Sequence, residues 1–163
     1  MIRKIFKKQK PNKKIAALIA KYKIPKAYLS VNRKSISNAM MIGMFFAMIP
    51  MPMQMLAVVF CVPFIKFNVP LSLTVVWITN PFTMPFIFYG EYLLGNIVLF
   101  REGVSEIILS VEWFQNNLDD IFVPLFVGAL VAGLVLSFVS RYLVMHLWKR
   151  SVHKEKREKE YQG

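Results

Sequence analysis

Two uncharged apolar stretches, each interrupted by paired prolines, constrain the fold of this chain more than any other feature. They cover residues 39–65 and 67–90, and the prolines lie near the middle of each stretch. Each stretch has the length of a bilayer crossing, about 20 apolar residues, yet its prolines remove hydrogen bonds that a continuous helix needs. Lipid cannot replace those bonds, so the interrupted backbone must lie against protein or water. We therefore expect a polar spot, enclosed by protein, at membrane depth.

The charges are segregated as in a membrane protein. The 163-residue chain is 56% hydrophobic and carries a formal charge of +12. Residues 1–34 hold twelve Lys or Arg and no acid, residues 141–163 hold seven Lys or Arg against three Glu, and residues 35–140 hold two bases and six acids. Because basic flanks stay in the cytoplasm, we expect a multi-pass protein with both termini cytoplasmic. The same boundaries predict a basic N-terminal segment, a membrane domain and a basic tail.

The remaining segments fit an all-α fold with one regular transmembrane helix. Residues 121–140 contain no charge and are long enough to span a bilayer. Amphipathic patterns predict interfacial helices over residues 13–23 and about 103–118, the second on the outer face and followed by a turn at Asp119 and Asp120. Overlapping pairs of small residues in the regular helix predict close packing on the broken segments or on a second subunit. They are Gly128, Ala129, Ala132 and Gly133.

The number of crossings leaves two arrangements of the broken stretches open. Cytoplasmic termini require an even total, so residues 39–100 must cross an odd number of times. In one arrangement residues 39–65 form a re-entrant hairpin and residues 69–100 cross once as a broken helix. In the other, residues 39–65 cross and residues 69–90 re-enter. Lys66 favours the first arrangement, which keeps this lysine in the cytoplasm.

Polar side chains beside the prolines are the candidate ligand-binding residues. With the prolines themselves and one nearby acid they are Pro50, Pro52, Gln54, Asn80, Pro81, Thr83, Pro85 and Glu91. Paired interrupted segments point to a transport site, and the half-helices after the breaks would offer free amide groups and partial positive charge to an anion. The competing interpretation is that these side chains only satisfy backbone groups freed by the prolines.

Glu91 is the acid within the apolar part of the second stretch. A carboxylate inside a membrane is costly unless it is paired or hydrated, and such a residue is a functional candidate by default. It could accept protons or meet Lys66 or Arg101. The alternative is a position near the interface, where a carboxylate costs little.

The sequence predicts no enzymatic activity, no cofactor and no metal site. It lacks a phosphate-binding glycine loop, HExxH, CxxC and any nucleophile with a credible base. Met51, Met53 and Met55 are spaced like soft-metal ligands, but methionine also fills irregular gaps around broken helices. The expected partners are membrane lipids with anionic head groups, bound by the basic ends, and a second copy of the chain in a homo-oligomer. Nucleic acid is not expected as a partner.

The residues around both breaks resemble a known bacterial family. The motifs are Ile49-Pro50-Met51-Pro52-Met53-Gln54, Asn68-Val69-Pro70-Leu71 and Trp77-Ile78-Thr79-Asn80-Pro81-Phe82-Thr83-Met84-Pro85. They are similar to those of small inner-membrane proteins catalogued as domain of unknown function 2062, over roughly residues 28–140. Met53 departs from the family pattern, in which Gly or an aromatic residue is common. The resemblance implies an integral protein of the bacterial cytoplasmic membrane and carries over no activity.

Taken together, these observations predict a small all-helical membrane protein of transport type, or one that handles lipid, with an anionic ligand between paired broken helices. The alternative is a structural or accessory membrane protein that binds anionic lipid or a partner protein without transport.

Overall fold

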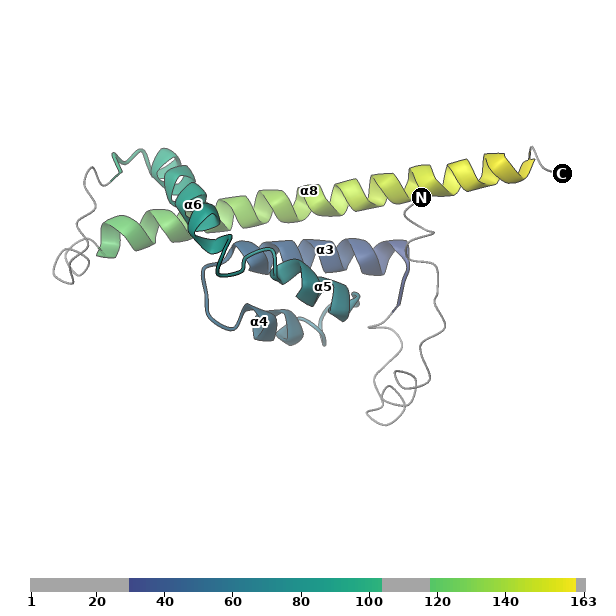
Figure 1. Ribbon diagram of the computed structural model, residues 1–163, viewed down its shortest axis with the longest axis horizontal. Coiled ribbons are helices and arrows are strands. Elements are labelled where there is room, and N and C mark those ends of the chain that lie inside the picture. The colour runs from purple at the N-terminus through teal and green to yellow at the C-terminus, as the bar shows by residue number, and fades with distance from the viewer. Residues whose placement is uncertain (1–29, 104–117, 161–163) are drawn as a thin grey trace.

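The computed structural model describes residues 30–103 and 118–160, in which every regular element is an α-helix (Figure 1). In chain order the helices are α3 (Arg33–Met48), α4 (Gln54–Phe60), α5 (Val69–Val76), α6 (Met84–Leu99) and α8 (Leu118–Glu160). The expected all-helical class is thus confirmed for the described residues. The amphipathic helix expected over residues 13–23 lies outside them, as do residues 104–117 of the second one.

The first proline cluster ends α3. The helix begins at a cap in which Asn32 Oδ1 accepts a hydrogen bond from the Ser35 N–H, 2.8 Å away. It ends at Ile49, whose backbone is extended at φ −79° and ψ 121°. The residue before a proline avoids the helical region, so Pro50 explains this end. The chain then turns through Met53 and starts α4 at Gln54.

Caps and prolines also define α5 and α6. Asn68 Oδ1 accepts a hydrogen bond from the Leu71 N–H at 3.0 Å and caps α5. Each of the two helices has a proline in its first turn, where the missing N–H costs nothing. The last turn of α6 closes with hydrogen bonds to the Asn96 and Ile97 carbonyls, while Phe100 takes a left-handed conformation at φ 52°.

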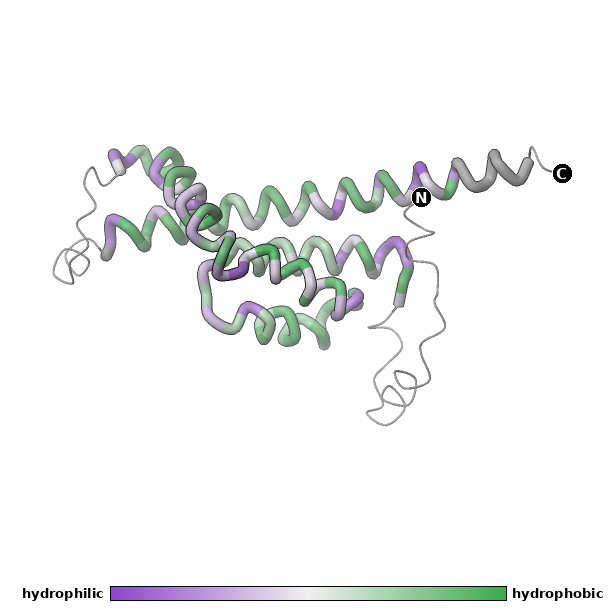
Figure 2. Tube along the Cα trace, viewed as in Figure 1, coloured by the Kyte–Doolittle hydropathy of each residue, from purple (hydrophilic) through white to green (hydrophobic). Residues whose placement is uncertain are grey.

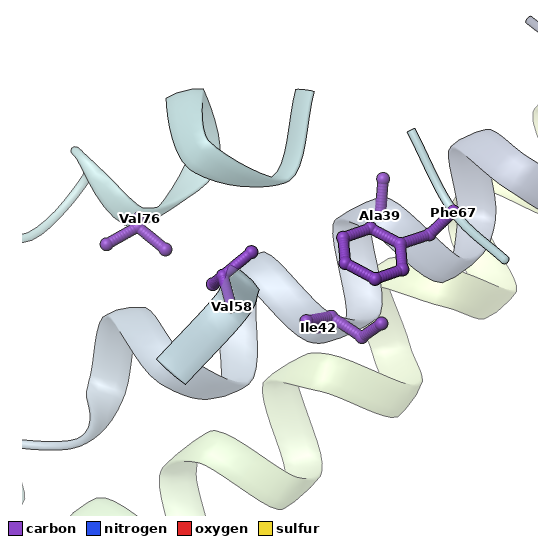
Figure 3. Packing of buried hydrophobic residues seen from close by; sticks show 5 residues of the cluster. All are labelled: Ala39, Ile42, Val58, Phe67 and Val76. Carbon is purple, nitrogen blue, oxygen red and sulfur yellow. The ribbon is translucent and has the colours of Figure 1, made fainter. Parts of the chain in front are cut away.

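The chain from α3 to α4 doubles back on itself. Near the start of α3, Asn38 Nδ2 donates to the Lys66 carbonyl at 3.1 Å, and the Asn68 N–H donates to the Ser35 carbonyl at 3.3 Å. The connection after α4 therefore ends beside the residues where α3 begins. A buried cluster fills the space between α3, α4 and α5 (Figure 3). It consists of Ala39, Ile42, Val58, Phe67 and Val76.

Glycines let α6 and α8 cross with their backbones in contact. A Cβ added to Gly95 would fall on the Pro124 carbonyl, and one added to Gly128 would fall on the Glu91 carbonyl and 2.8 Å from the Gly95 nitrogen. A Cβ on Gly133 would lie 3.3 Å from the Phe45 carbonyl of α3. The small residues of α8 thus pack against both neighbouring helices, as expected of such pairs in membrane proteins.

Helix α8 is longer than the sequence predicted. The regular helix was expected over residues 121–140, but α8 continues to Glu160, since no proline or glycine follows Gly133 before that residue. Asp119 and Asp120, expected in a turn, instead form its first turn, where carboxylates are favoured by the helix dipole. Within the described residues, α8 is the one helix long and apolar enough to cross a membrane, over Asp119–His153.

Hydrophobic residues make up most of the helices (Figure 2). Large side chains that are more than half exposed include Phe60, Phe82, Phe86, Ile97 and Phe138. Soluble monomers rarely expose contiguous apolar areas of this kind. Together with the length of α8, this surface indicates association with a membrane.

Candidate functional site

The first break is closed by a buried glutamine. Gln54 Nε2 donates a hydrogen bond to the Ile49 carbonyl, 2.8 Å away, and so satisfies a group at the end of α3. Gln54 is placed for this contact because Met53 adopts a left-handed conformation, φ 64° and ψ 31°, that turns the chain into α4. The glutamine was singled out from the sequence, and its hydrogen bond is of the local kind that the competing interpretation predicts.

The second break is closed by Asn80 and Thr83. Asn80 Oδ1 accepts hydrogen bonds from the N–H groups of Phe82 at 3.0 Å and Thr83 at 3.2 Å. Thr83 Oγ1 in turn donates to the Ile78 carbonyl at 2.6 Å, and the Met84 N–H donates to the Asn80 carbonyl at 2.8 Å. The N–H groups of Phe82, Thr83 and Met84 are therefore not free at this break. An asparagine before a proline caps the following backbone itself.

A threonine that sequence reasoning missed joins the two breaks. Thr79 Oγ1 donates a 2.5 Å hydrogen bond to the Ala47 carbonyl, in the last turn of α3. Both residues are buried. The bond holds the start of the second break against the end of α3, so the polar groups of both breaks gather at one level of the fold. The only signal in the sequence was a hydroxyl residue directly before Asn80-Pro81, and nothing identified its partner.

The prolines themselves face outward. Pro52, Pro81 and Pro85 are exposed and Pro50 is half-buried, while Phe82 is 82% exposed. The expectation that protein encloses both proline clusters is thus not met within one copy of the chain. The physical reason is that prolines have no N–H to satisfy. At the second break the neighbouring N–H groups of Phe82 and Thr83 are in addition already bonded to Asn80.

Two side-chain amides at the breaks keep unused hydrogen-bonding capacity. Asn80 Nδ2 makes one long bond of 3.3 Å to the Trp77 carbonyl, which leaves a second N–H without a partner among the described residues. The Gln54 Oε1 atom likewise accepts no hydrogen bond from the described part of the chain. The breaks therefore offer one donor and one acceptor to a further molecule, although they are internally capped.

Glu91 lies apart from the breaks, on the face of α6 that packs on α8. Its residue is only 3% exposed, and neither carboxylate oxygen has a hydrogen-bond partner in the structure. The two bases considered as partners do not pair with it. Arg101 Nη1 instead lies 3.8 Å from Asp120 Oδ1, at the opposite end of α6 from the breaks, and the Lys66 carbonyl lies beside α3.

Basic side chains collect at the end of the fold where α3 begins. Arg33, Lys34 and Lys66 are exposed there, and Arg141 of α8 donates from Nη1 to the Met41 thioether at 3.3 Å. Because Met41 lies on α3, this contact fixes α3 and α8 antiparallel, with their basic ends together. Figure 2 shows the corresponding hydrophilic colour at the start of α3. This end carries no acid among residues 30–66.

Comparison with known proteins identifies the family and goes no further. No curated protein matches the chain, and no solved structure matches it. A family model described as "Uncharacterized protein conserved in bacteria (DUF2062)" matches residues 17–157. That match covers the basic N-terminal segment in part, both breaks and nearly all of α8. The resemblance seen in the motifs is thereby confirmed, and the chain belongs to this bacterial family, domain of unknown function 2062.

Proposed function

We propose that this protein is embedded in the bacterial cytoplasmic membrane and is of transport type. In this proposal α3 and α4 form a re-entrant hairpin, α5 and α6 cross once as a broken helix, and α8 crosses back. The contacts of Asn38 with Lys66 and of Asn68 with Ser35 support the hairpin, because they return the chain to the end where α3 began. Both termini would then lie on the cytoplasmic side with the basic residues.

The polar layer at the two breaks would be the ligand site. The observation that carries the proposal is the Thr79–Ala47 hydrogen bond, which brings the two interruptions together within an otherwise apolar body. The spare Asn80 N–H and Gln54 Oε1 supply groups that a polar ligand can use. The ligand is proposed to be anionic, since no acid occurs at either break and the basic end lies beyond them. No residue of this layer is proposed to be catalytic.

Anionic lipid head groups are the proposed partners of the basic end. Arg33, Lys34 and Lys66 are exposed there without an acidic partner among the described residues. Each basic residue near an anionic surface contributes roughly 1 kcal/mol of attraction. A second copy of the chain is proposed to cover the exposed prolines, because bare interrupted backbone does not occur against lipid.

Cysteine accessibility tests the wet polar layer. In a Cys61→Ala background, Met51→Cys and Thr83→Cys are treated with a water-soluble maleimide in intact membranes. Both are expected to react, whereas Leu130→Cys, on the exposed middle of α8, is expected not to. Lys66→Cys serves as the positive control and reports whether this residue is cytoplasmic. Failure of both break positions to react, with Lys66→Cys reactive, would overturn the transport-type proposal.

A second candidate is a structural or accessory protein, and the hydrogen bonds at the breaks favour it. Within the described residues, every hydrogen bond of the Gln54 and Thr83 side chains runs to backbone no more than five residues away, as expected if they only support packing. Gln54→Ala and Asn80→Ala separate the two candidates. A loss of cellular phenotype at normal abundance supports transport, whereas a loss of abundance or assembly alone supports the structural role.

A further inference from the structure

Glu91 occupies the most enclosed position of any charged side chain in the described residues. It lies on the stripe of α6 that contacts α8, one turn before Gly95. Gly128 packs directly on its backbone, and Gly95 packs on Pro124, so the backbones of the two helices are in contact there. Both carboxylate oxygens are buried and lack any hydrogen-bond partner. A polar group buried without a partner is rare enough in native structures to need an explanation.

No opposite charge faces Glu91 from the elements around it. Helix α8, which packs most closely on α6, has no charged residue between Asp120 and Arg141. Along the helix these lie about 12 Å and 20 Å from Gly128, at 1.5 Å per residue. Helix α3 has none after Lys34, and α4 and α5 have none at all. On α6 itself the other titratable side chains are those of Tyr89 and Tyr92.

An isolated carboxylate in such surroundings does not remain charged. Neither an ion pair nor hydrogen-bond donors offset the free energy lost on desolvation of the carboxylate. A buried acid of this kind therefore takes up a proton. A neutral carboxylic acid keeps one O–H group. Its proton is released to water or to another acceptor when the contact between the helices opens. The Cα–Cβ bond of a helical residue tilts toward the helix N-terminus. The Glu91 Cβ is therefore tilted toward the end of α6 that follows the second break, whose Pro85 lies about 9 Å away along the helix axis.

We propose that Glu91 is a proton-exchange site, which carries one proton as a neutral acid when α6 and α8 are packed and exchanges it through the second break. This inference rests on the proposed function and deepens it by naming the proton as the coupling ion. The step is a simple acid dissociation: the O–H bond of the Glu91 carboxyl breaks, the electron pair stays on the carboxylate and the proton leaves to water. No metal ion or redox partner takes part.

Dicyclohexylcarbodiimide provides the test, because this apolar reagent modifies protonated carboxyl groups in apolar surroundings. The full chain is treated in detergent micelles and the modified residue is located by peptide mass spectrometry. We expect a stable acylurea on Glu91 and none on Glu102, an exposed acid three residues after the end of α6. Labelling should fall with rising pH, at the alkaline end by about tenfold per pH unit as the protonated fraction does. Added Na⁺ should give no protection.

Two variants keep the result interpretable. Glu91→Gln is isosteric and neutral, so it should fold and lose the label, whereas Glu102→Gln should retain it. In addition, the infrared carbonyl stretch of a protonated carboxylic acid should be present in the wild type and missing from Glu91→Gln. Absence of that band from the folded wild type would overturn the proposal, whatever the labelling shows. Protection by Na⁺ would also overturn it, in favour of a metal-cation site.

The outcome is distinguishable from failure of the proposed function. Labelling and the infrared band report the protonation of Glu91 alone, and they do not require water at the breaks. A protonated Glu91 with unreactive Met51→Cys and Thr83→Cys would remove the transport-type proposal and leave this acid as a proton store. If both cysteines at the breaks react but Glu91 is ionised, the transport-type proposal stands and the proton-exchange site is ruled out.

Discussion

A left-handed backbone conformation at Met53 joins the first break to α4. Its φ of 64° is one that L-residues other than asparagine and aspartate rarely adopt, and its side chain is 73% exposed. The conformation is costly for methionine, at about 1–2 kcal/mol, because Cβ approaches the following carbonyl. A glycine would take this conformation without the steric cost. The side chain has little burial to offset this cost.

Met53→Gly is therefore expected to raise the free energy of unfolding by about 0.5 to 1 kcal/mol, after the greater freedom of glycine in the unfolded chain is subtracted. The measurement is thermal or denaturant unfolding in detergent micelles. Met55→Gly, the same replacement inside α4, should lower stability by about 0.5–1 kcal/mol. Equal effects of the two variants would show that φ at Met53 is not strained.

Gln54→Ala should lower stability by about 0.5–1.5 kcal/mol, since the buried Ile49 carbonyl would lose the glutamine donor and keep only the Met51 N–H, which donates to it at 2.8 Å. Gln54→Glu removes the donor while keeping the shape, and is expected to destabilise by at least as much. A destabilised Ala variant with a fully stable Glu variant would mean that packing, rather than the hydrogen bond, makes Gln54 important.

At the residue scale, the sequence identified the polar residues at the breaks but not all of their hydrogen-bond partners. Gln54, Asn80 and Thr83 could be selected because polar side chains beside prolines have few other roles in an apolar stretch. The partner of Thr79 could not, because Ala47 lies 32 residues away and the bond exists only once α3 and the second break have packed. The burial of Glu91 could not be predicted either, because it is produced by packing on α8, which comes much later in the chain.

Among the elements, the contact between α6 and α8 has the least tolerance for added volume. Gly95 and Gly128 sit where any Cβ would overlap the backbone of the opposite helix. The small-residue pairs predicted a close neighbour for α8, but composition gave no way to choose between a broken segment and another subunit. The proline clusters did predict the helix ends correctly, because their effect on backbone geometry is local.

Gly128→Ala should push α6 away from α8 and destabilise the protein by more than the 1–3 kcal/mol typical of overpacking, since backbone rather than a flexible side chain is in the way. Gly95→Ala should behave alike. The control is Gly90→Ala, also in α6, where an added Cβ meets nothing within 4 Å. Gly90→Ala should be neutral or stabilising by up to about 1 kcal/mol. Retention of wild-type stability by both Gly128→Ala and Gly95→Ala would contradict this packing.

For the whole molecule, the separation of charge should be measurable as lipid preference. Anionic lipid is expected to stabilise the solubilised protein more than zwitterionic lipid does, by roughly 1 kcal/mol per basic residue near the surface. Arg33→Gln combined with Lys34→Gln should remove part of this difference, and added salt should remove more. Arg101→Gln, at the opposite end of the fold, is the control. If Arg101→Gln reduces the stabilisation by anionic lipid as much as the changes at Arg33 and Lys34 do per charge, then total charge, and not its position, governs the lipid preference.

The exposed prolines make a second whole-molecule prediction. If a second copy covers the breaks, Phe82→Cys in the Cys61→Ala background should form an intermolecular disulfide under mild oxidation, more readily than Leu130→Cys. Both positions are exposed in one copy of the chain, so the comparison reports the contact between copies. Preferential cross-linking at Leu130 would assign the contact to α8 and leave the breaks facing lipid or ligand.

The hairpin was one of two arrangements left open by the sequence, and Lys66 alone favoured it. Two hydrogen bonds in the folded chain support the proposed hairpin, because Asn38 and Asn68 hold the Lys66 region against the start of α3. Neither asparagine was singled out beforehand, because a polar residue near the end of an apolar stretch has many ordinary roles.

The 43 residues of α8 make a rod about 65 Å long at 1.5 Å per residue, roughly twice the thickness of a hydrocarbon layer of about 30 Å. In the proposed topology about half of this helix would protrude from the bilayer, on the cytoplasmic side with the basic residues. A fluorophore attached near Glu160 would stand several nanometres from the headgroups, at a height that energy transfer to labelled lipids can gauge. Cytosolic proteins could then bind the protruding part of α8 without approaching the bilayer.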